Sequence, residues 1–521
     1  MHIINVGSVG REAAMLQRIV SAFCIFVAVS TAFGQTPASQ TSYKDITDRI
    51  QSISKVPLSD CRAHGDIPHP EDPAVDDSDW RPTKLGAEFT SGVQVLRCWY
   101  TVPEKINGYA TRDVSLKVAF ELQGDGMTML SVFSNNASIY RGSSDTLEPI
   151  PLTTKAQPGE RFLVAMRLEV GDQPRTLSRS EILLTAPASR PDLELLRIEL
   201  LSLQPILNAY PDTSRSQQMD AAAKAIDFGK LDAGDQKGFD ASLKEAQEKL
   251  QSLDPWIKQF RIRAVGNSHI DMAWLWPWTE TVEVVRNTYR SALNMMDEYP
   301  GFVFAGSSAR TYEWMEEKYP DLFKEMQQRV KDGRWEIVGG MWVEPDLNMP
   351  GGESLTRQIL IGKQYFHRKF GVDVKIGWNP DSFGYNWQLP QIYKKSGIDY
   401  FVTQKLLWAH EFTTFPYKLF WWESPDGSRL LTYFPHDYGS MMEPVSMAED
   451  VSVWMPSIYW QNLKDPQMLY LYGVGDHGGG PTRTMLDSAT QLMSPGVVFP
   501  KLQFSSASEF FSDLDKRHDL E

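Results

Sequence analysis

From Arg261 to the end of the chain, short apolar runs alternate with longer amphipathic segments. Arg261–Gly266 is typical of a buried strand, residues 279–296 of a helix, and Met468–Tyr472 of another strand. This alternation favours a parallel sheet with helices outside it, either a barrel or a doubly wound sheet. In both architectures, functional side chains lie at the carboxyl ends of the strands. We therefore expect an α/β catalytic domain over residues 261–521.

The residues before Arg261 follow other patterns. In Val114–Leu122, as in other runs between residues 85 and 190, apolar residues alternate with polar ones, which predicts a β-sandwich of jelly-roll type. Residues 191–260 are rich in Leu, Ala and Lys, which predicts a helical connector. Residues 35–84 are rich in Ser, Pro and Asp, which predicts a linker or loosely ordered lead-in.

Residues 1–34 are typical of a signal peptide. Arg11 and Arg18 precede an apolar run, and small residues lie before a cleavage site near Gly34/Gln35. The apolar run is too short to span a bilayer. We expect a secreted or periplasmic protein with no membrane span after signal removal. The alternative is a buried or membrane-anchoring helix.

The net charge of the chain limits the class of its main binding partner, and its cysteines bear on the compartment in which it folds. The net charge of -14 and the pI near 5.2 argue against nucleic acid or an anionic membrane as the main partner. Of three cysteines, Cys24 leaves with the signal peptide, and Cys61 and Cys98 remain. An oxidising compartment permits a disulfide between them, but the sequence leaves open whether they meet. It also leaves the oligomeric state open.

Two strand ends carry groups suited to a metal or to catalysis. His269 and Asp271 lie two residues apart after Arg261–Gly266, so in extended backbone they point the same way. Imidazole with carboxylate suits Zn²⁺ or a neighbouring transition metal, although a lone His-x-Asp is often structural. Asp381 follows another short strand, where an aspartate that caps a turn is the simpler interpretation.

Two further strand ends extend this set. Asp476 ends an apolar strand within a run of glycines, which permits close approach of a ligand but also suits a flexible turn. No Lys-Ser/Thr follows, which excludes a phosphate-binding loop. Another strand is followed by three residues that could bind sugar hydroxyls or simply be loop residues: Trp342, Glu344 and Asp346.

Taken together, these motifs resemble the α-mannosidases of glycoside hydrolase family 38, over residues 261–521. HIDMAWLWP is similar to the family's metal motif, GWNPDSFGY to its nucleophile motif and YGVGDHGGGPT to its acid/base segment. The resemblance implies a seven-stranded β/α barrel with one zinc ion, or another divalent transition metal, in its cleft. It implies these roles: metal ligands His269, Asp271 and Asp381; nucleophile Asp381; general acid/base Asp476; sugar subsite Trp274 and Phe383; further substrate contacts Trp342, Glu344, Asp346 and Lys405.

The reaction that the resemblance implies is retaining hydrolysis of terminal α-linked mannose from oligosaccharides or glycans. Such a mechanism needs two carboxyl groups roughly 5–5.5 Å apart, one as nucleophile and one as acid/base. The metal would bind the cis 2- and 3-hydroxyls of mannose and hold the ring in a distorted shape. Linkage specificity and the natural glycan are not readable from the sequence.

The sequence departs from the family pattern in two places. In the family, a later histidine completes the zinc site, in a segment followed by helical and β-rich C-terminal regions, whereas this chain ends at Glu521. We therefore expect a truncated chain with little mannosidase activity when expressed alone. His477 stands where the family pattern has glycine, either as a nitrogen ligand or as a loop variant. The fourth ligand stays open.

Two other functions remain as alternatives. A metal-dependent polysaccharide deacetylase also uses a small barrel with a His/Asp metal site, but it needs neither a nucleophile at Asp381 nor the glycine-rich segment around Asp476. A catalytically incomplete mannose-binding protein would retain the ligands without turnover. Release of acetate would favour the first, and mannose binding without hydrolysis the second.

Overall fold

The computed structural model describes residues 38–124, 128–144, 147–408, 415–459 and 465–517. The predicted signal peptide lies outside these residues. Two compact units divide the chain, residues 1–48 and 49–521, and helix α2 (Ala38–Ser54) crosses the boundary between them. Within the described ranges, no helix combines the length and the apolar character that crossing a membrane requires.

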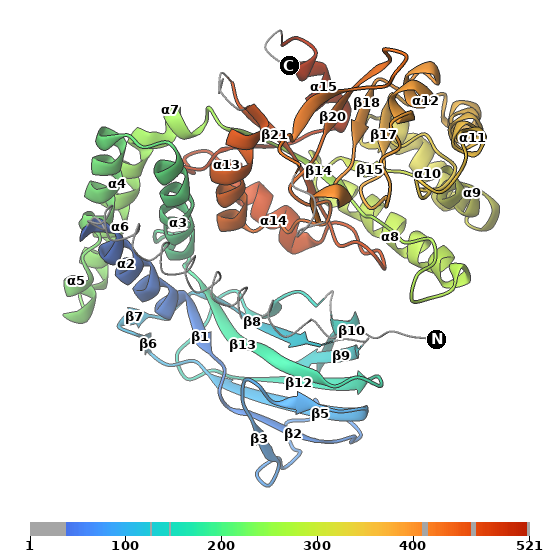
Figure 1. The fold of residues 1–521 in the computed structure, drawn as a ribbon. Helices are drawn as coiled ribbons and strands as arrows, with labels where there is room; N and C mark the ends of the chain where they lie inside the picture. Colours follow the sequence, from blue (N-terminus) through green and yellow to red (C-terminus); the bar gives the residue numbers. More distant parts are fainter. Residues whose placement is uncertain (1–37, 125–127, 145–146, 409–414, 460–464, 518–521) are drawn as a thin grey trace, which may run out of the picture. The chain divides into compact units, whose positions relative to one another are not determined.

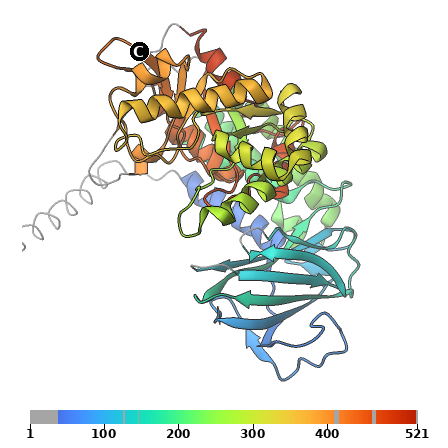
Figure 2. The same ribbon diagram turned by 90° about the vertical axis from the view of Figure 1, so that its right-hand side faces the viewer.

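Two antiparallel sheets occupy the region predicted to be a sandwich. Apolar side chains from both sheets, among them Leu96, Leu130 and Leu177, line one shared core, so the sheets pack face to face (Figures 1 and 2). The jelly-roll connectivity stays a prediction. The strand order of the first sheet is β1-β13-β8-β11 with β4 beside β13, and its strands are β1 (Lys55–Pro57), β4 (Glu88–Phe89), β8 (Ser115–Gln123), β11 (Ile150–Thr153) and β13 (Arg175–Thr185). The order of the second is β10-β9-β12-β5-β2-β3, and its strands are β2 (Cys61–Gly65), β3 (Arg81–Thr83), β5 (Gly92–Thr101), β9 (Thr128–Ser134), β10 (Ala137–Ser143) and β12 (Arg161–Val170).

The segment predicted as a loose lead-in, residues 35–84, contributes strands β1, β2 and β3 to these sheets. Strands of three to five residues are too short to display an alternating pattern, which is why the sequence did not reveal them. Cys61 of β2 lies directly opposite Cys98 of β5, and the two form a disulfide. The pairing that the sequence left open is therefore made across two neighbouring strands.

Replacing both cysteines with serine is expected to lower the unfolding free energy of the sandwich by about 4 kcal/mol. The disulfide closes a loop with a sequence separation of 37, and a loop of this length removes about that much conformational freedom from the unfolded chain. Urea unfolding followed by Trp fluorescence, with and without reductant, measures the change. A double variant whose unfolding midpoint equals that of the oxidised parent would contradict the prediction.

Helices fill residues 191–260, the predicted connector. Four of them begin at an aspartate whose side chain accepts a hydrogen bond from the helix backbone: Asp192, Asp212, Asp227 and Asp235. The helices are α3 (Leu193–Ala209), α4 (Thr213–Ala225), α5 (Phe228–Asp232), α6 (Gln236–Leu250) and α7 (Asp254–Ile257).

A buried carboxyl group in α3 makes the stability of this unit depend on pH. Glu199 is fully buried; one oxygen accepts the Val498 N–H at 2.8 Å, and the other is buried without a hydrogen-bond partner. Burial raises the pKa of Glu199 to about 7 despite that hydrogen bond. Because the folded chain then holds a proton that the unfolded chain releases above pH 4.5, stability falls as the pH rises from 4.5 through 7.

A Glu199→Gln variant is expected to remove this pH dependence, since the amide keeps the acceptor for Val498 but cannot ionise. The difference between the pKa of Glu199 in the folded chain and that in the unfolded chain corresponds to about 3 kcal/mol of stability. The parent loses all of this stability above pH 7. Thermal unfolding midpoints of parent and variant, measured between pH 5 and 8, test this. The unfolding midpoint of the variant should rise relative to that of the parent as the pH increases. Midpoints that change with pH in the same way in both proteins would contradict the assignment.

The region from β14 onward is a mixed α/β fold built on parallel strands. The strand order of one sheet is β16-β15-β14-β21, with β22 beside β14, and that of the other is β17-β18-β20-β19. All pairs are parallel except β19 with β20. The strands are β14 (Arg261–Asn267), β15 (Phe304–Gly306), β16 (Trp335–Ile337), β17 (Ile376–Trp378), β18 (Tyr400–Val402), β19 (Leu419–Glu423), β20 (Arg429–Tyr433), β21 (Gln467–Tyr472) and β22 (Lys501–Phe504).

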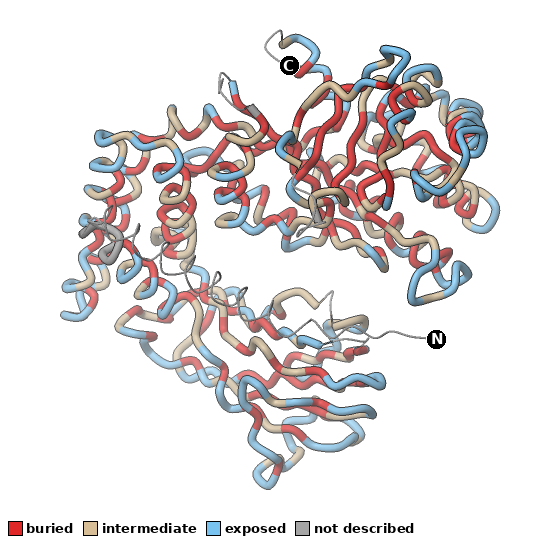
Figure 3. The backbone as a smooth tube through the Cα atoms, in the orientation of Figure 1, coloured by how far each residue is buried: buried red, intermediate tan, exposed pale blue. Residues whose placement is uncertain are grey.

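Helices α9 to α12 lie along the outside of these strands (Figure 1), and the strands are largely buried (Figure 3). The helices of this region are α8 (Trp278–Glu298), α9 (Ala309–Lys318), α10 (Pro320–Lys331), α11 (Gly352–Phe370), α12 (Leu389–Lys395), α13 (Pro444–Tyr459), α14 (Arg483–Leu492) and α15 (Ala507–Leu514).

The described residues do not form a closed seven-stranded barrel. At the junction of β16 and β17, the Gly339 N–H donates to the Ile376 carbonyl at 2.8 Å, but no ladder of strand pairing links the two sheets there. At the junction of β20 and β21, the Tyr433 hydroxyl donates to the Leu469 carbonyl, and Ser440, beyond the end of β20, forms an isolated parallel bridge with Tyr472 of β21. β16 and β17 have three residues each, which leaves few backbone groups for pairing at their junction. The α/β prediction holds, and closure of the barrel is not confirmed.

Candidate metal centre and active site

Three chemically active side chains follow the ends of three buried parallel strands. His269 follows β14, Asp381 follows β17 and Asp476 follows β21. The turn after β21 requires glycine, because Gly473 has φ +132° and a Cβ there would lie 2.1 Å from the Asn267 carbonyl. This close approach brings the loop after β21 against the loop after β14.

His269, Asp271 and Asp476 could hold a metal ion. Each offers a ligand atom, and these atoms all lie within 4.8 Å of one another. His269 is buried, and its Nδ1 atom is buried without a hydrogen-bond partner at 3.7 Å from Asp476 Oδ1, too far for a hydrogen bond. An unsatisfied buried nitrogen beside two carboxylates fits a divalent cation with mixed nitrogen and oxygen ligands.

The charges in this group are coupled. Burial by itself would lower the pKa of His269, but the carboxylates of Asp476 and Glu344 outweigh it and raise the pKa to about 10. Burial raises the pKa of Asp271, and the surrounding carboxylates add to that effect. The imidazole of His269 lowers the pKa of Asp476. An excess of carboxylates around one histidine is the charge balance that a bound cation would neutralise.

Asp381 lies in the same cavity but is not a member of the group of three. A cavity of about 170 Å³ is lined by His269, Asp271 and Asp381 together. The Oδ1 atom of Asp381 accepts from the Lys405 ammonium at 2.5 Å and from the Tyr438 hydroxyl at 2.6 Å. These two donors orient the carboxylate and stabilise its negative charge.

Glu344 contacts protein groups on both sides of the site. One oxygen lies 3.1 Å from His269 Nε2, and the other accepts the Asp381 backbone N–H at 3.0 Å. Glu344 therefore joins the loop after β14 to the loop after β17. This arrangement is that of a carboxylate that orients a metal-binding histidine.

The other residues predicted to contact substrate are distributed around this centre. Phe383 and Asp346 line the same cavity, and the Lys405 ammonium lies 4.8 Å from the centroid of the Phe383 ring. Trp274 is 62% exposed and contacts Trp276 edge to face. Trp342 packs edge-on against Tyr365. Neither Trp274 nor Trp342 is among the described residues that line the cavity.

Tyr438 is a residue of this site that was not predicted from the sequence. Its hydroxyl donates to Asp381, its ring lies edge-on to His269 with centroids 5.2 Å apart, and burial together with the Asp381 carboxylate raises its pKa, which keeps the hydroxyl protonated. Tyr438 comes five residues after β20. The rule that functional groups follow strand ends could therefore have identified it.

The chain is similar to one family model and to several α-mannosidases. The family model described as "Glycosyl hydrolases family 38 N-terminal domain" matches residues 259–520, half of the chain. Alpha-mannosidase G of Dictyostelium discoideum is 30% identical over 460 residues, covering 84% of this chain and 41% of that protein. Alpha-mannosidase 2C1 of Homo sapiens is 40% identical over 263 residues, covering 49% of this chain and 24% of that protein. Alpha-mannosidase of Saccharomyces cerevisiae is 38% identical over 277 residues, covering 50% of this chain and 24% of that protein.

The matched regions thus span less than half the length of these relatives. The family match covers the region from β14 onward, which carries His269, Asp381 and Asp476. The chain belongs to glycoside hydrolase family 38.

Proposed function

We propose that this site hydrolyses terminal α-linked mannose with retention of configuration. The observation that carries the proposal is the convergence of His269, Asp271 and Asp381 on one small cavity, with Asp476 beside His269. The names of the three relatives, all α-mannosidases, support the substrate class. The disulfide between Cys61 and Cys98 supports export to an oxidising compartment, secreted or periplasmic.

His269, Asp271 and Asp381 would hold the metal, and zinc is the cation that these donors favour. When bound, the ion would act as a Lewis acid that binds two sugar hydroxyls and favours a distorted ring. Glu344 orients His269 for this purpose.

In this proposal Asp381 is the nucleophile. Lys405 and Tyr438 both contact its Oδ1 atom, which fixes the direction in which the carboxylate faces the cavity. Attack on the anomeric carbon forms a glycosyl ester and releases the leaving oxygen, which takes a proton from the general acid. Water then hydrolyses the ester, and the same group receives the proton that the water loses.

Asp476 is the group that we assign to this proton transfer. It is 60% exposed at its side chain, as a group that exchanges protons with water requires. A general acid needs a raised pKa, whereas the His269 imidazole lowers the pKa of Asp476. That lowering depends on a protonated imidazole, and a histidine that binds a metal is neutral. The acid role of Asp476 also requires that Asp476 does not bind the cation itself, because a carboxylate that binds a metal stays ionised.

An assay with a fluorogenic aryl α-mannoside tests the proposal directly, since it detects slow turnover. The full 521-residue chain is incubated with and without added zinc, and proton NMR follows the anomer that forms first. Release of α-mannose supports the proposal, and β-mannose as the first product would contradict retention. Release of acetate from an acetylated polysaccharide, or mannose binding without any turnover, would replace the proposal with one of the alternatives.

A further inference from the structure

The glycine-rich loop, residues 473–480, determines where the Asp476 carboxylate lies. Asp476 itself has φ +59°, a conformation that non-glycine residues adopt at a cost. Its side chain is mostly exposed, so packing around the carboxylate does little to hold it. The position of this group therefore depends on how the backbone of the loop is anchored.

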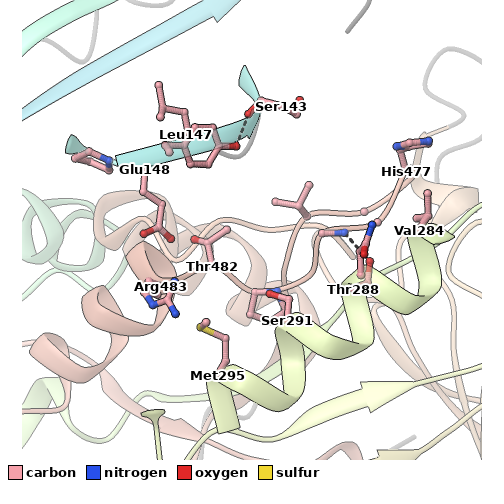
Figure 4. Close-up of a pocket in the computed structure, with 18 of the residues that line it drawn as sticks. Ser143, Leu147, Glu148, Val284, Thr288, Ser291, Met295, His477, Thr482 and Arg483 are labelled. Carbon is pink, nitrogen blue, oxygen red and sulfur yellow. Dashed lines mark hydrogen bonds between the residues drawn. The ribbon is translucent and has the colours of Figure 1, made fainter. Parts of the chain in front are cut away.

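Helix α8 anchors the loop at two points. His477 Nε2 lies 2.7 Å from Glu280 Oε1, and the Gly479 N–H donates to Thr288 Oγ1 at 2.9 Å. Figure 4 shows His477 and Thr288 at the wall of a cavity of about 820 Å³. Between the two anchors, a Cβ at Gly478 would lie 2.5 Å from Thr288 Oγ1, so the loop backbone runs directly against the helix.

The same loop is also tied to the segment that carries Asp271. The Asp271 N–H donates to the Asp476 carbonyl at 2.9 Å, and Ile270 forms an isolated antiparallel bridge with His477. The His477 ring packs edge to face on Trp276, with centroids 4.3 Å apart. A shift of His477 would therefore move Asp476, which directly precedes it in the loop.

We infer that the contact between His477 and Glu280 is a latch, a side-chain link that holds the loop against α8 and so positions Asp476 for proton transfer. His477 acts as a positioning residue: its Nε2 atom is engaged by Glu280, and among the described residues it is not a member of the group of possible metal ligands. This decides between the two sequence interpretations in favour of a loop variant with a role of its own. The inference rests on the proposed acid/base function of Asp476.

Substrates with different leaving groups distinguish a positioning role of His477 from a merely structural one. A general acid matters most when the departing oxygen is basic, as in an alkyl mannoside, and least when it leaves readily, as in dinitrophenyl mannoside. Displacement of a catalytic group by about 1 Å can cost about 100-fold in rate. A displaced Asp476 should therefore slow formation of the glycosyl ester selectively from the alkyl substrate, whereas general damage to the fold would slow this step equally for both substrates.

The test uses His477→Ala in the full chain with zinc present. We expect kcat/KM on methyl α-mannoside to fall about 10- to 100-fold, with kcat/KM on dinitrophenyl α-mannoside within about twofold of the parent, because kcat/KM reports formation of the glycosyl ester and not its hydrolysis. His477→Gln, whose amide can still donate to Glu280, should recover most of the loss. Arg290→Ala is the matched control, because it removes an ion pair of α8 with Glu325 that does not involve the loop. An equal loss on both substrates would overturn the inference.

Hydrogen exchange at the amides of residues 473–480 provides a readout that needs no turnover. His477→Ala and Glu280→Ala should each accelerate exchange, and the double variant should exchange no faster than either single one, because both remove the same contact. Exchange equal to that of the parent in both single variants would refute the latch. A parent chain without mannosidase activity would refute the proposed function, while the exchange data would still decide whether the latch exists.

Discussion

An Asp381→Asn variant is expected to form no covalent adduct with an activated fluorinated α-mannosyl fluoride, a reagent that labels the nucleophile of a retaining enzyme. The amide is nearly isosteric, so it can keep the contact of Oδ1 with Tyr438, but it cannot form the glycosyl ester. We expect turnover of an aryl mannoside to fall by at least about 10⁴-fold. Intact-mass spectrometry followed by peptide mapping measures the labelling, which in the parent should fall on Asp381.

An Asp476→Asn variant is the matched control for this experiment. A fluoride leaves without a proton, so a variant that lacks only the general acid should still be labelled at Asp381. Hydrolysis of the adduct should be slow, because activation of water requires the same group. Labelling lost in the Asp476 variant and kept in the Asp381 variant would reverse the two assigned roles.

Removal of His269 should have the largest effect on the metal. His269→Ala deletes the nitrogen donor of the group and leaves two carboxylates, so we expect zinc affinity to fall by more than about 100-fold. Glu344→Gln should lower it by about 10- to 100-fold, the usual effect of a residue that orients a metal-binding histidine. Competition with a chromophoric zinc chelator measures both without any assay of activity.

Asp346→Asn is the control for the metal experiment. Asp346 lines the same cavity, and its Oδ1 atom accepts the backbone N–H groups of Asn348 and Met349, contacts that the amide oxygen preserves. The zinc affinity of the Asp346→Asn variant should match that of the parent. The same titration on the Asp381 and Asp476 variants identifies which carboxylate completes the site. An unchanged affinity in His269→Ala would contradict the metal centre.

The sequence predicted the strand-end positions of His269, Asp381 and Asp476, because alternating apolar runs and loops are local features of the chain. It could not predict that Asp476 lies in one group with His269 and Asp271, since this approach depends on the turn at Gly473. Glu344 was predicted to contact substrate, which stays a prediction; its contacts with His269 and the Asp381 backbone N–H were not predicted. Contacts between loops that are distant in sequence, such as that of Tyr438 with Asp381, leave no periodic signal.

The pairing of β14 determines when the site can form during synthesis of the chain. β14 is the first strand of its domain, yet it pairs with β21 and β22, which are made about 200 residues later. Contacts of such long sequence separation form slowly. At the ribosome, therefore, His269 and Asp271 emerge long before Asp476 can join them, and until then residues 261–264 of β14 have no partner among the described strands on either edge. In this interval the nascent chain is open to misassembly, and a chaperone would be most useful then.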